Sequence, residues 1–283
     1  MSARSLRSIH RAQREDIGEL VTRRPVPGSG LEQVDPFLFL NHHGPQTYPP
    51  GNQGLPFGPH PHRGFETVTF ILQGNLAHRD TGGGESVVEA GGVQWMTAGR
   101  GLIHAELSPK SFKREGGPLE ILQLWVNLPS ALKLAEPNYV PVTAAEIPAV
   151  ELAPGVSMRA VSGSEGAPIA SLTGVMLATV EMAAGSSAAL PAPAGRSVFF
   201  YTVRGTARIG SGEVPEHHLA QLSDGEGVAV SSEAGCVILY GHADPIGEPV
   251  VAHGPFVMNT REEILQALQD YQRGVFGDPA GLG

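Results

Sequence analysis

His60-Pro61-His62-Arg63-Gly64-Phe65-Glu66 is the stretch around which this chain is organised, and His104-Ala105-Glu106 follows it about forty residues later. Each motif places side chains two residues apart, and such residues point to the same face of an extended strand. Three imidazoles and a carboxylate that meet at one point suit a divalent first-row metal such as iron, manganese, cobalt, nickel, copper or zinc. The spacing therefore predicts one metal site, with the ligands His60, His62, His104 and Glu106.

The sequence around these motifs has the pattern of short strands joined by tight turns. The apolar run 67–72 ends at Gln73-Gly74, and similar turn signals recur about every eight to twelve residues without helical periodicity. Glycine (37) and proline (24) are abundant, whereas charged residues make up only 17%. This pattern predicts an all-β protein built as an antiparallel sandwich or barrel.

A second strand-rich half follows a stretch rich in Ala, Pro, Lys and Glu. The run 70–74 resembles the run 201–205, since each is an apolar strand that ends in a polar residue and glycine. This echo favours a duplication, with domains at residues 1–135 and 136–283. The second half has Ala192-Pro193-Ala194-Gly195-Arg196-Ser197 where the paired histidines stand in the first. We therefore expect no metal ligands in the second domain.

One short helix is predicted near the carboxyl end of the chain. Asn259 or Thr260 is its expected N-cap, and Gly274 is expected to end it. Acidic residues in the first turn stabilise such a helix, because they interact favourably with its dipole. The face expected to be apolar consists of Ile264, Leu265, Leu268 and Tyr271.

Charge and hydropathy exclude several classes of protein. A net charge of −9 argues against direct binding to nucleic acid, which needs a basic surface. The arginines at positions 4, 7, 11 and 14 are interpreted as a solvated strand or arm. The sequence contains no apolar run of about 18 residues, so no membrane span is predicted. The amino terminus lacks the apolar core of a secretory signal. The single cysteine, Cys236, fits a core position, and a cytoplasmic location is expected.

Five stretches together carry a family resemblance, and HPHRGFET is the most specific of them. They are the runs at residues 35–44, 59–67, 99–106, 122–129 and 254–264. The chain resembles the pirin family of the cupin superfamily from about residue 20 to residue 277. The resemblance implies two tandem cupin barrels, which are double-stranded β-helices or jelly rolls. It also implies one metal, generally iron as Fe(II), at the four predicted ligands.

Several functions follow from this resemblance. Some pirins oxidatively cleave quercetin, so the first expectation is a quercetin 2,3-dioxygenase-like, metal-dependent oxidoreductase. It would act with O2 on a flavonol or a similar chelating aromatic substrate, and Glu106 would remove the substrate's proton. The alternative is an iron-holding, redox-responsive regulator that binds a protein partner without turnover. A third hypothesis is an isomerase or another metal-assisted enzyme on the same scaffold. The sequence leaves the physiological metal, the natural substrate and the oligomeric state open, and a monomer is compatible with it.

Four further residues are expected beside the metal ligands. Glu66 competes with Glu106, because many cupins place a ligand glutamate shortly after the paired histidines. Glu106 is favoured since it shares a strand face with His104, and Glu66 is then expected to lie next to the ligands. His42 and His43 are interpreted as loop or pocket-wall residues in preference to ligands. Arg63 is interpreted as a neighbour of the ligands or as a structural residue.

Overall fold

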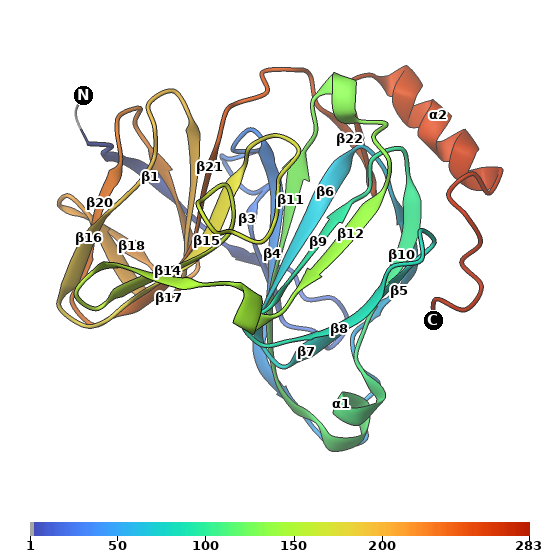
Figure 1. Ribbon diagram of the computed structural model, residues 1–283, viewed down its shortest axis with the longest axis horizontal. Helices are drawn as coiled ribbons and strands as arrows, with labels where there is room; N and C mark the ends of the chain where they lie inside the picture. The colour runs from blue at the N-terminus through green and yellow to red at the C-terminus, as the bar shows by residue number, and fades with distance from the viewer. Residues whose placement is uncertain (1–2) are drawn as a thin grey trace. The chain divides into compact units, whose positions relative to one another are not determined.

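The computed structural model describes residues 3–283 and consists mainly of antiparallel strands (Figure 1). By contact density the chain divides into two compact units. One contains residues 14–23, 38–144 and 246–283, and the other contains residues 24–37 and 145–245 together with the segment up to Gln13. Each unit holds one barrel, so the prediction of an all-β protein with two cupin barrels is confirmed.

The first barrel is formed by a seven-stranded sheet and a four-stranded sheet. The larger sheet has the order β12-β9-β6-β11-β4-β3-β2, and the smaller has the order β5-β10-β7-β8. The strands are β2 (Gln13–Arg14), β3 (Thr22–Val26), β4 (Phe37–Tyr48), β5 (Phe57–His62), β6 (Phe65–Gln73), β7 (Asn75–Asp80), β8 (Glu85–Glu89), β9 (Val93–Thr97), β10 (Leu102–Leu107), β11 (Gly117–Asn127) and β12 (Asn138–Val142). The helix α1 (Lys110–Glu115) connects β10 to β11.

The side chains of β10 alternate between two environments, and this alternation positions the site. Ile103 and Ala105 belong to an apolar cluster that also contains Ile264 and Ala267 of the helix α2 (Arg261–Gln272). The hairpin of β22 (Val251–His253) and β23 (Phe256–Met258) contributes Phe256 to the same cluster. Because successive residues of a strand face opposite sides, His104 and Glu106 point the other way, toward the barrel interior.

The second barrel is formed by one ten-stranded sheet, and the amino-terminal strand β1 pairs with its strand β19. Its interior is filled by an apolar cluster that includes Val180, Phe200 and Tyr240. The strands are β1 (Leu6–Arg11), β13 (Ala149–Ala153), β14 (Val156–Ser162), β15 (Met176–Met182), β16 (Ser186–Leu190), β17 (Ser197–Ile209), β18 (Gly212–Pro215), β19 (His218–Leu222), β20 (Val228–Ser232) and β21 (Cys236–Ala243). Two 3-10 turns, Ser130–Leu132 and Ala144–Glu146, complete the described elements.

The echo between the halves of the sequence ends, in each half, at a glycine with the same backbone requirement. Gly74 follows β6 and Gly205 lies within β17, with φ angles of 81° and 72°. A Cβ atom at either glycine would lie 2.6 Å or less from a backbone oxygen, namely that of Pro118 or of Gly235. Both sites therefore require glycine for two reasons, the left-handed backbone and the close approach of a neighbouring chain segment.

The carboxyl-terminal helix begins where the sequence predicts. Thr260 is the N-cap of α2, and it forms a capping box with Glu263. Of the face expected to be buried, Ile264 is 6% exposed, but Leu265 is 58% exposed and lies in solvent. Ala267 is buried beside Ile264 instead of Leu265. Its small side chain allows the helix to approach its neighbours closely.

The two contact units differ from a division into contiguous halves. The strand β12 lies beyond residue 135 and pairs with β9 of the first barrel, and the unit of that barrel also includes residues 246–283. The predicted domains at 1–135 and 136–283 stay a prediction. Among residues 3–283, no helix has the length and the apolar character needed to cross a membrane.

Candidate metal centre

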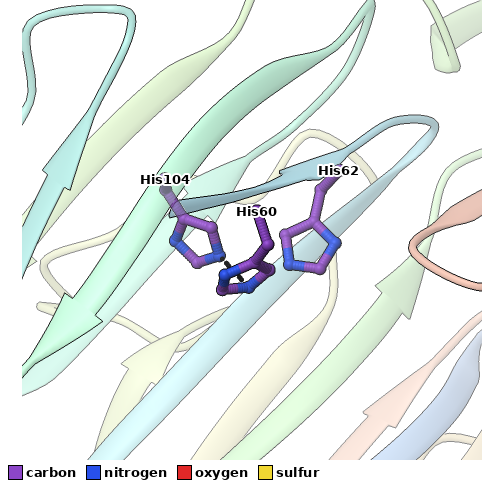
Figure 2. Close-up of side chains that lie close together, drawn as sticks. All are labelled: His60, His62 and His104. Carbon is purple, nitrogen blue, oxygen red and sulfur yellow. Dashed lines mark hydrogen bonds between the residues drawn. The ribbon is translucent and has the colours of Figure 1, made fainter. Parts of the chain in front are cut away.

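Three imidazoles meet inside the first barrel, from two neighbouring strands (Figure 2). His60 and His62 lie on β5, and His104 lies opposite His60 on the paired strand β10. Their ring centroids are 4.3 to 4.9 Å apart, and one ring nitrogen of each histidine lies within 4.8 Å of the others. Among residues 3–283 this is the one such group of three or more histidine, cysteine or acidic side chains.

The backbone fixes which nitrogen of two of these rings is available. Nδ1 of His60 lies 2.8 Å from the carbonyl oxygen of Gly58, and Nδ1 of His62 lies 3.4 Å from that of Pro255. A carbonyl oxygen only accepts hydrogen bonds, so Nδ1 must carry the proton in each ring. Nε2 of a neutral ring then keeps its lone pair, as a metal ligand requires.

The environment of His62 and His104 favours their neutral form. His62 and His104 are 3% and 0% exposed. Burial, followed by the neighbouring His60, lowers the pKa of His62 to about 3. Burial and the adjacent imidazoles also hold the pKa of His104 well below its usual value. His60 is partly exposed, so the cluster opens toward solvent on that side.

The spacing of the nitrogens fits one metal ion. Nε2 of His60 and Nε2 of His104 are 2.9 Å apart. Two nitrogens bound at right angles to a metal, each about 2.1 Å from it, would be separated by about 3.0 Å. Nε2 of His62 is buried and has no hydrogen-bond partner in the described part of the chain. A buried polar atom without a partner is costly, and a metal at this point would satisfy it.

Glu106 lies near this cluster but is not a member of it. It is 4% exposed and follows His104 by two residues on β10. Its Oε1 accepts a hydrogen bond of 3.2 Å from Thr69, and its Oε2 accepts one of 2.6 Å from Gln123. Thr69 lies on β6 and Gln123 lies on β11, and both side chains point into the barrel. The carboxylate is thus held on the same side of β10 as His104.

The structure does not bring Glu66 to the histidines. Its Oε1 accepts hydrogen bonds from Trp95 and Thr97, at 3.0 and 2.6 Å. Because Glu66 and Thr69 are three residues apart on β6, they project from opposite faces of that strand. Burial raises the pKa of Glu66. This carboxyl group therefore belongs to the packing behind the strand and lies away from the side that holds Glu106.

The other residues expected beside the ligands have separate partners. Nε2 of His42 lies 3.0 Å from Oε1 of Glu120, and both side chains are fully buried. Nδ1 of His43 lies 2.9 Å from the hydroxyl of Thr22.

Arg63 acts as an anchor for the carboxyl-terminal segment. Its Nε donates to the carbonyl oxygen of Arg100, and its Nη1 donates to Asp270 of α2 at 2.8 Å. Its guanidinium group also lies 4.6 Å from the centre of the Phe276 ring. The contacts of Arg63 therefore support the structural reading of this residue.

A second histidine system lies beside the cluster, and the sequence interpretation missed it. His78 lies opposite Glu106 on β7, its ring centroid is 5.3 Å from that of His104, and it is 2% exposed. Its Nε2 lies 2.7 Å from Asp80, and its ring stacks on Tyr139 with centroids 3.8 Å apart. Burial alone would raise the pKa of Asp80, but hydrogen bonds, chiefly from His78, lower it. The signal in the sequence was the pair His78 and Asp80, which has the same spacing as His60 and His62.

An aromatic wall encloses His62, and it was also missed. The rings of Phe65 and Trp125 lie 5.1 and 5.4 Å from that of His62, both edge to face. Phe39 stacks on Trp125 at 4.6 Å. Trp125 is two residues from Gln123 on β11, so the strand presents both side chains to the site.

A buried lysine holds the turn that follows His62. Nζ of Lys133 donates to the carbonyl oxygens of Gly64 and Val257, at 2.9 and 3.0 Å, and to Oδ1 of Asn127 at 2.7 Å. Lys133 is 1% exposed. Its three N–H groups meet three acceptors, and so it fixes three chain segments next to β5.

Comparison with known proteins places this geometry in a family. The profile of the Pirin family matches residues 19–126, and that of the Pirin C-terminal cupin domain matches residues 177–277. A pirin-like protein of Solanum lycopersicum is 40% identical over 95% of this chain and 91% of its own length. Human pirin is 36% identical over 96% of this chain and 93% of its own length. The crystal structure of quercetin 2,3-dioxygenase from Acinetobacter baumannii is similar, with a TM-score of 0.92, 30% identity and coverage of 98% of this chain and 100% of that one.

Proposed function

This chain belongs to the pirin family, and from that premise we propose that its first barrel is a mononuclear, metal-dependent dioxygenase that cleaves a flavonol or a similar chelating aromatic substrate with O2. The observation that carries the proposal is the convergence of His60, His62 and His104 on one point. The solved structure with 30% identity bears the name quercetin 2,3-dioxygenase, which supports this substrate class.

The proposed ligands are the three histidines and Glu106, with Fe(II) as the expected ion. A bound first-row metal would supply the redox chemistry between substrate and dioxygen. Glu106 supports the proposal by its place two residues after His104.

Glu106 has a second proposed role as the base. A flavonol carries a hydroxyl group beside a carbonyl group, and the hydroxyl must lose its proton before it can chelate a cation well. A carboxylate oxygen of Glu106 would accept that proton. The hydrogen bonds from Thr69 and Gln123 hold the carboxylate in place for this transfer.

The surroundings of the histidines suit an aromatic ligand. Phe65 and Trp125 provide an apolar wall next to His62, which can pack against a flat ring and exclude water. His60 is partly exposed, and substrate and dioxygen would enter on its side.

The test is aerobic incubation with quercetin of protein whose metal content has been measured. Wild type should bind about one metal ion per chain and consume the flavonol absorbance, and His62→Ala should lose both properties. His218→Ala, a histidine of the second barrel, is the matched control and should keep both. Metal-loaded wild type that leaves quercetin and related flavonols intact would refute the dioxygenase. That result would instead favour an iron-holding regulator that binds a protein partner.

A further inference from the structure

The second barrel has a cavity of about 350 Å³ whose lining is basic. Three arginines line it, Arg4, Arg7 and Arg196, against one acidic residue, Asp224. The turn before β17, residues 192–197, forms part of this lining, and this turn stands where the first half of the sequence has its paired histidines. Of the three arginines, Arg196 belongs to this turn, and Arg4 and Arg7 come from the amino-terminal segment.

Arg4 is a buried cation whose charge has little compensation. It is 6% exposed, and its two terminal nitrogens donate to the carbonyl oxygens of Ser223, Pro193 and Arg196 at 2.8 to 3.2 Å. Carbonyl oxygens accept hydrogen bonds but carry no net charge. The Asp224 carboxylate is 3.6 Å away, and its side chain is 69% exposed. Nε of Arg4 is buried and has no hydrogen-bond partner within residues 3–283.

Arg196 has the same kinds of contact as Arg4, namely backbone carbonyl acceptors and one exposed carboxylate. Its Nη2 donates to the carbonyl oxygens of Gly174 and His242, at 2.6 and 3.3 Å. Its Nε is buried and also lacks a hydrogen-bond partner in the described chain. The carboxylate of Asp244 lies 3.7 Å away on a side chain that is 77% exposed. Backbone carbonyls therefore hold both guanidinium groups in position, and each keeps an N–H group without an acceptor.

The local field is positive although the protein is acidic. Burial, together with the charges of Arg196 and Arg4, lowers the pKa of His242 to about 4. Hydrogen bonds from the backbone of Gly195 and Gly225, with smaller contributions from Arg4 and Arg7, lower the pKa of Asp224. The whole chain has a net charge of −9, which repels anions in general. The lining of the cavity, with three arginines and one aspartate, has a formal charge of +2 in a chain that is acidic overall.

We propose that this cavity binds a small oxyanion, a carboxylate or phosphate group, between Arg4, Arg7 and Arg196. Guanidinium groups present N–H donors in a planar fork that matches carboxylate and phosphate oxygens. The lining also includes Val34, Val198 and Leu222, which leave an apolar surface for the carbon skeleton of a small organic acid. The site is separate from the proposed metal centre and does not depend on its function.

The test is calorimetric titration of the full-length protein at low ionic strength with inorganic phosphate and, separately, with succinate. Saturable binding of either anion is expected, and the anion that binds identifies the group that is recognised. Arg7→Gln should weaken it about tenfold, because a charge-assisted donor is lost. Arg7 is exposed, so this change should leave the barrel folded. Arg11→Gln is the matched control, since it removes an equal charge from the same strand outside the cavity.

Two results would overturn the proposal. One is that neither anion shows saturable binding to wild type at millimolar concentrations. The other is that Arg11→Gln weakens binding as much as Arg7→Gln, since the effect would then come from the general charge of the strand. Arg4→Gln should abolish binding, and its circular dichroism spectrum would show whether the variant remains folded.

Discussion

Gln123 Nε2 lies 2.6 Å from Oε2 of Glu106, and the hydrogen bond joins the large sheet of the first barrel to the strand of His104. Thr69 donates to the other oxygen of the same carboxylate at 3.2 Å. Each oxygen therefore has its own donor from its own strand. Since a carboxylate held at both oxygens has a fixed plane, these two donors determine how Glu106 faces the histidines.

Replacement of Thr69 by valine should lower flavonol turnover about tenfold, because a hydrogen bond to a charged group contributes about 1.5 kcal/mol or more. Valine keeps the shape of the side chain and removes only the hydroxyl. Thr67→Val is the control, since Thr67 is buried on the same face of β6 and Thr69 is the donor to Glu106. Initial rates should be compared at equal metal content. Equal losses in the two variants would mean that the hydrogen bond has no role in turnover.

Removal of the metal by a chelator should lower the thermal unfolding midpoint of the protein. An ion present at a hundred times its dissociation constant stabilises the folded state by about 2.7 kcal/mol. Scanning calorimetry of metal-free and metal-loaded protein measures the difference. His62→Ala should show none, and His218→Ala should show the full shift. A metal-dependent shift that persists in His62→Ala would exclude His62 as a ligand.

Lys133→Met should destabilise the first barrel by about 3 kcal/mol, since it leaves buried acceptors of three chain segments without a donor. Urea unfolding gives the free energy directly. Lys110→Met is the control, because Lys110 is exposed and should tolerate the change within about 0.5 kcal/mol. If Lys133→Met were as stable as Lys110→Met, the buried hydrogen bonds of Lys133 would not contribute to stability.

Acid should weaken the second barrel between pH 6.5 and pH 4. The pKa of His242 falls from its usual 6.5 to about 4 in the folded protein, mainly through burial. Between these values the unfolded chain binds a proton that the folded chain lacks, so stability is full above pH 6.5 and is lost as the pH falls. The loss should be of the order of 3 kcal/mol.

Urea unfolding at several pH values in this range measures that loss. His242→Phe keeps a ring at the position and removes the titration, so the variant should lose less stability on acidification than wild type. Parallel pH profiles for the two proteins would show that another group causes the acid sensitivity.

The cluster of His60, His62 and His104 could be predicted from the sequence because its geometry is local. His60 and His62 have the spacing of one strand face, and His104 and Glu106 repeat it on a neighbouring strand. The face that Glu66 takes could not be predicted from the sequence, also for a local reason. Gly64 has a φ angle of 88° and turns the chain between β5 and β6, so the alternation of side chains does not continue from His62 to Glu66. Only the pairing of β6 with its neighbours shows which face Glu66 takes.

Other features depend on contacts between distant parts of the sequence. His78 is next to His104 only because β7 pairs with β10. The arginines of the amino-terminal segment were interpreted as a solvated strand or arm, and Arg7 and Arg11 are indeed exposed on β1. Arg4 is buried instead, because β1 pairs with β19 and brings it to carbonyl oxygens about 190 to 220 residues away in the sequence.

The carboxyl-terminal hairpin and helix bear on the order in which the metal centre can be assembled during synthesis. Pro255 provides the carbonyl oxygen that orients His62, and Asp270 holds Arg63 beside it. The ribosome makes these residues roughly 150 residues after His104. A nascent chain therefore carries all three imidazoles well before the segment that sets the orientation of His62. If the proposed centre binds a metal, loading is then expected only after Pro255 and Asp270 have left the ribosome.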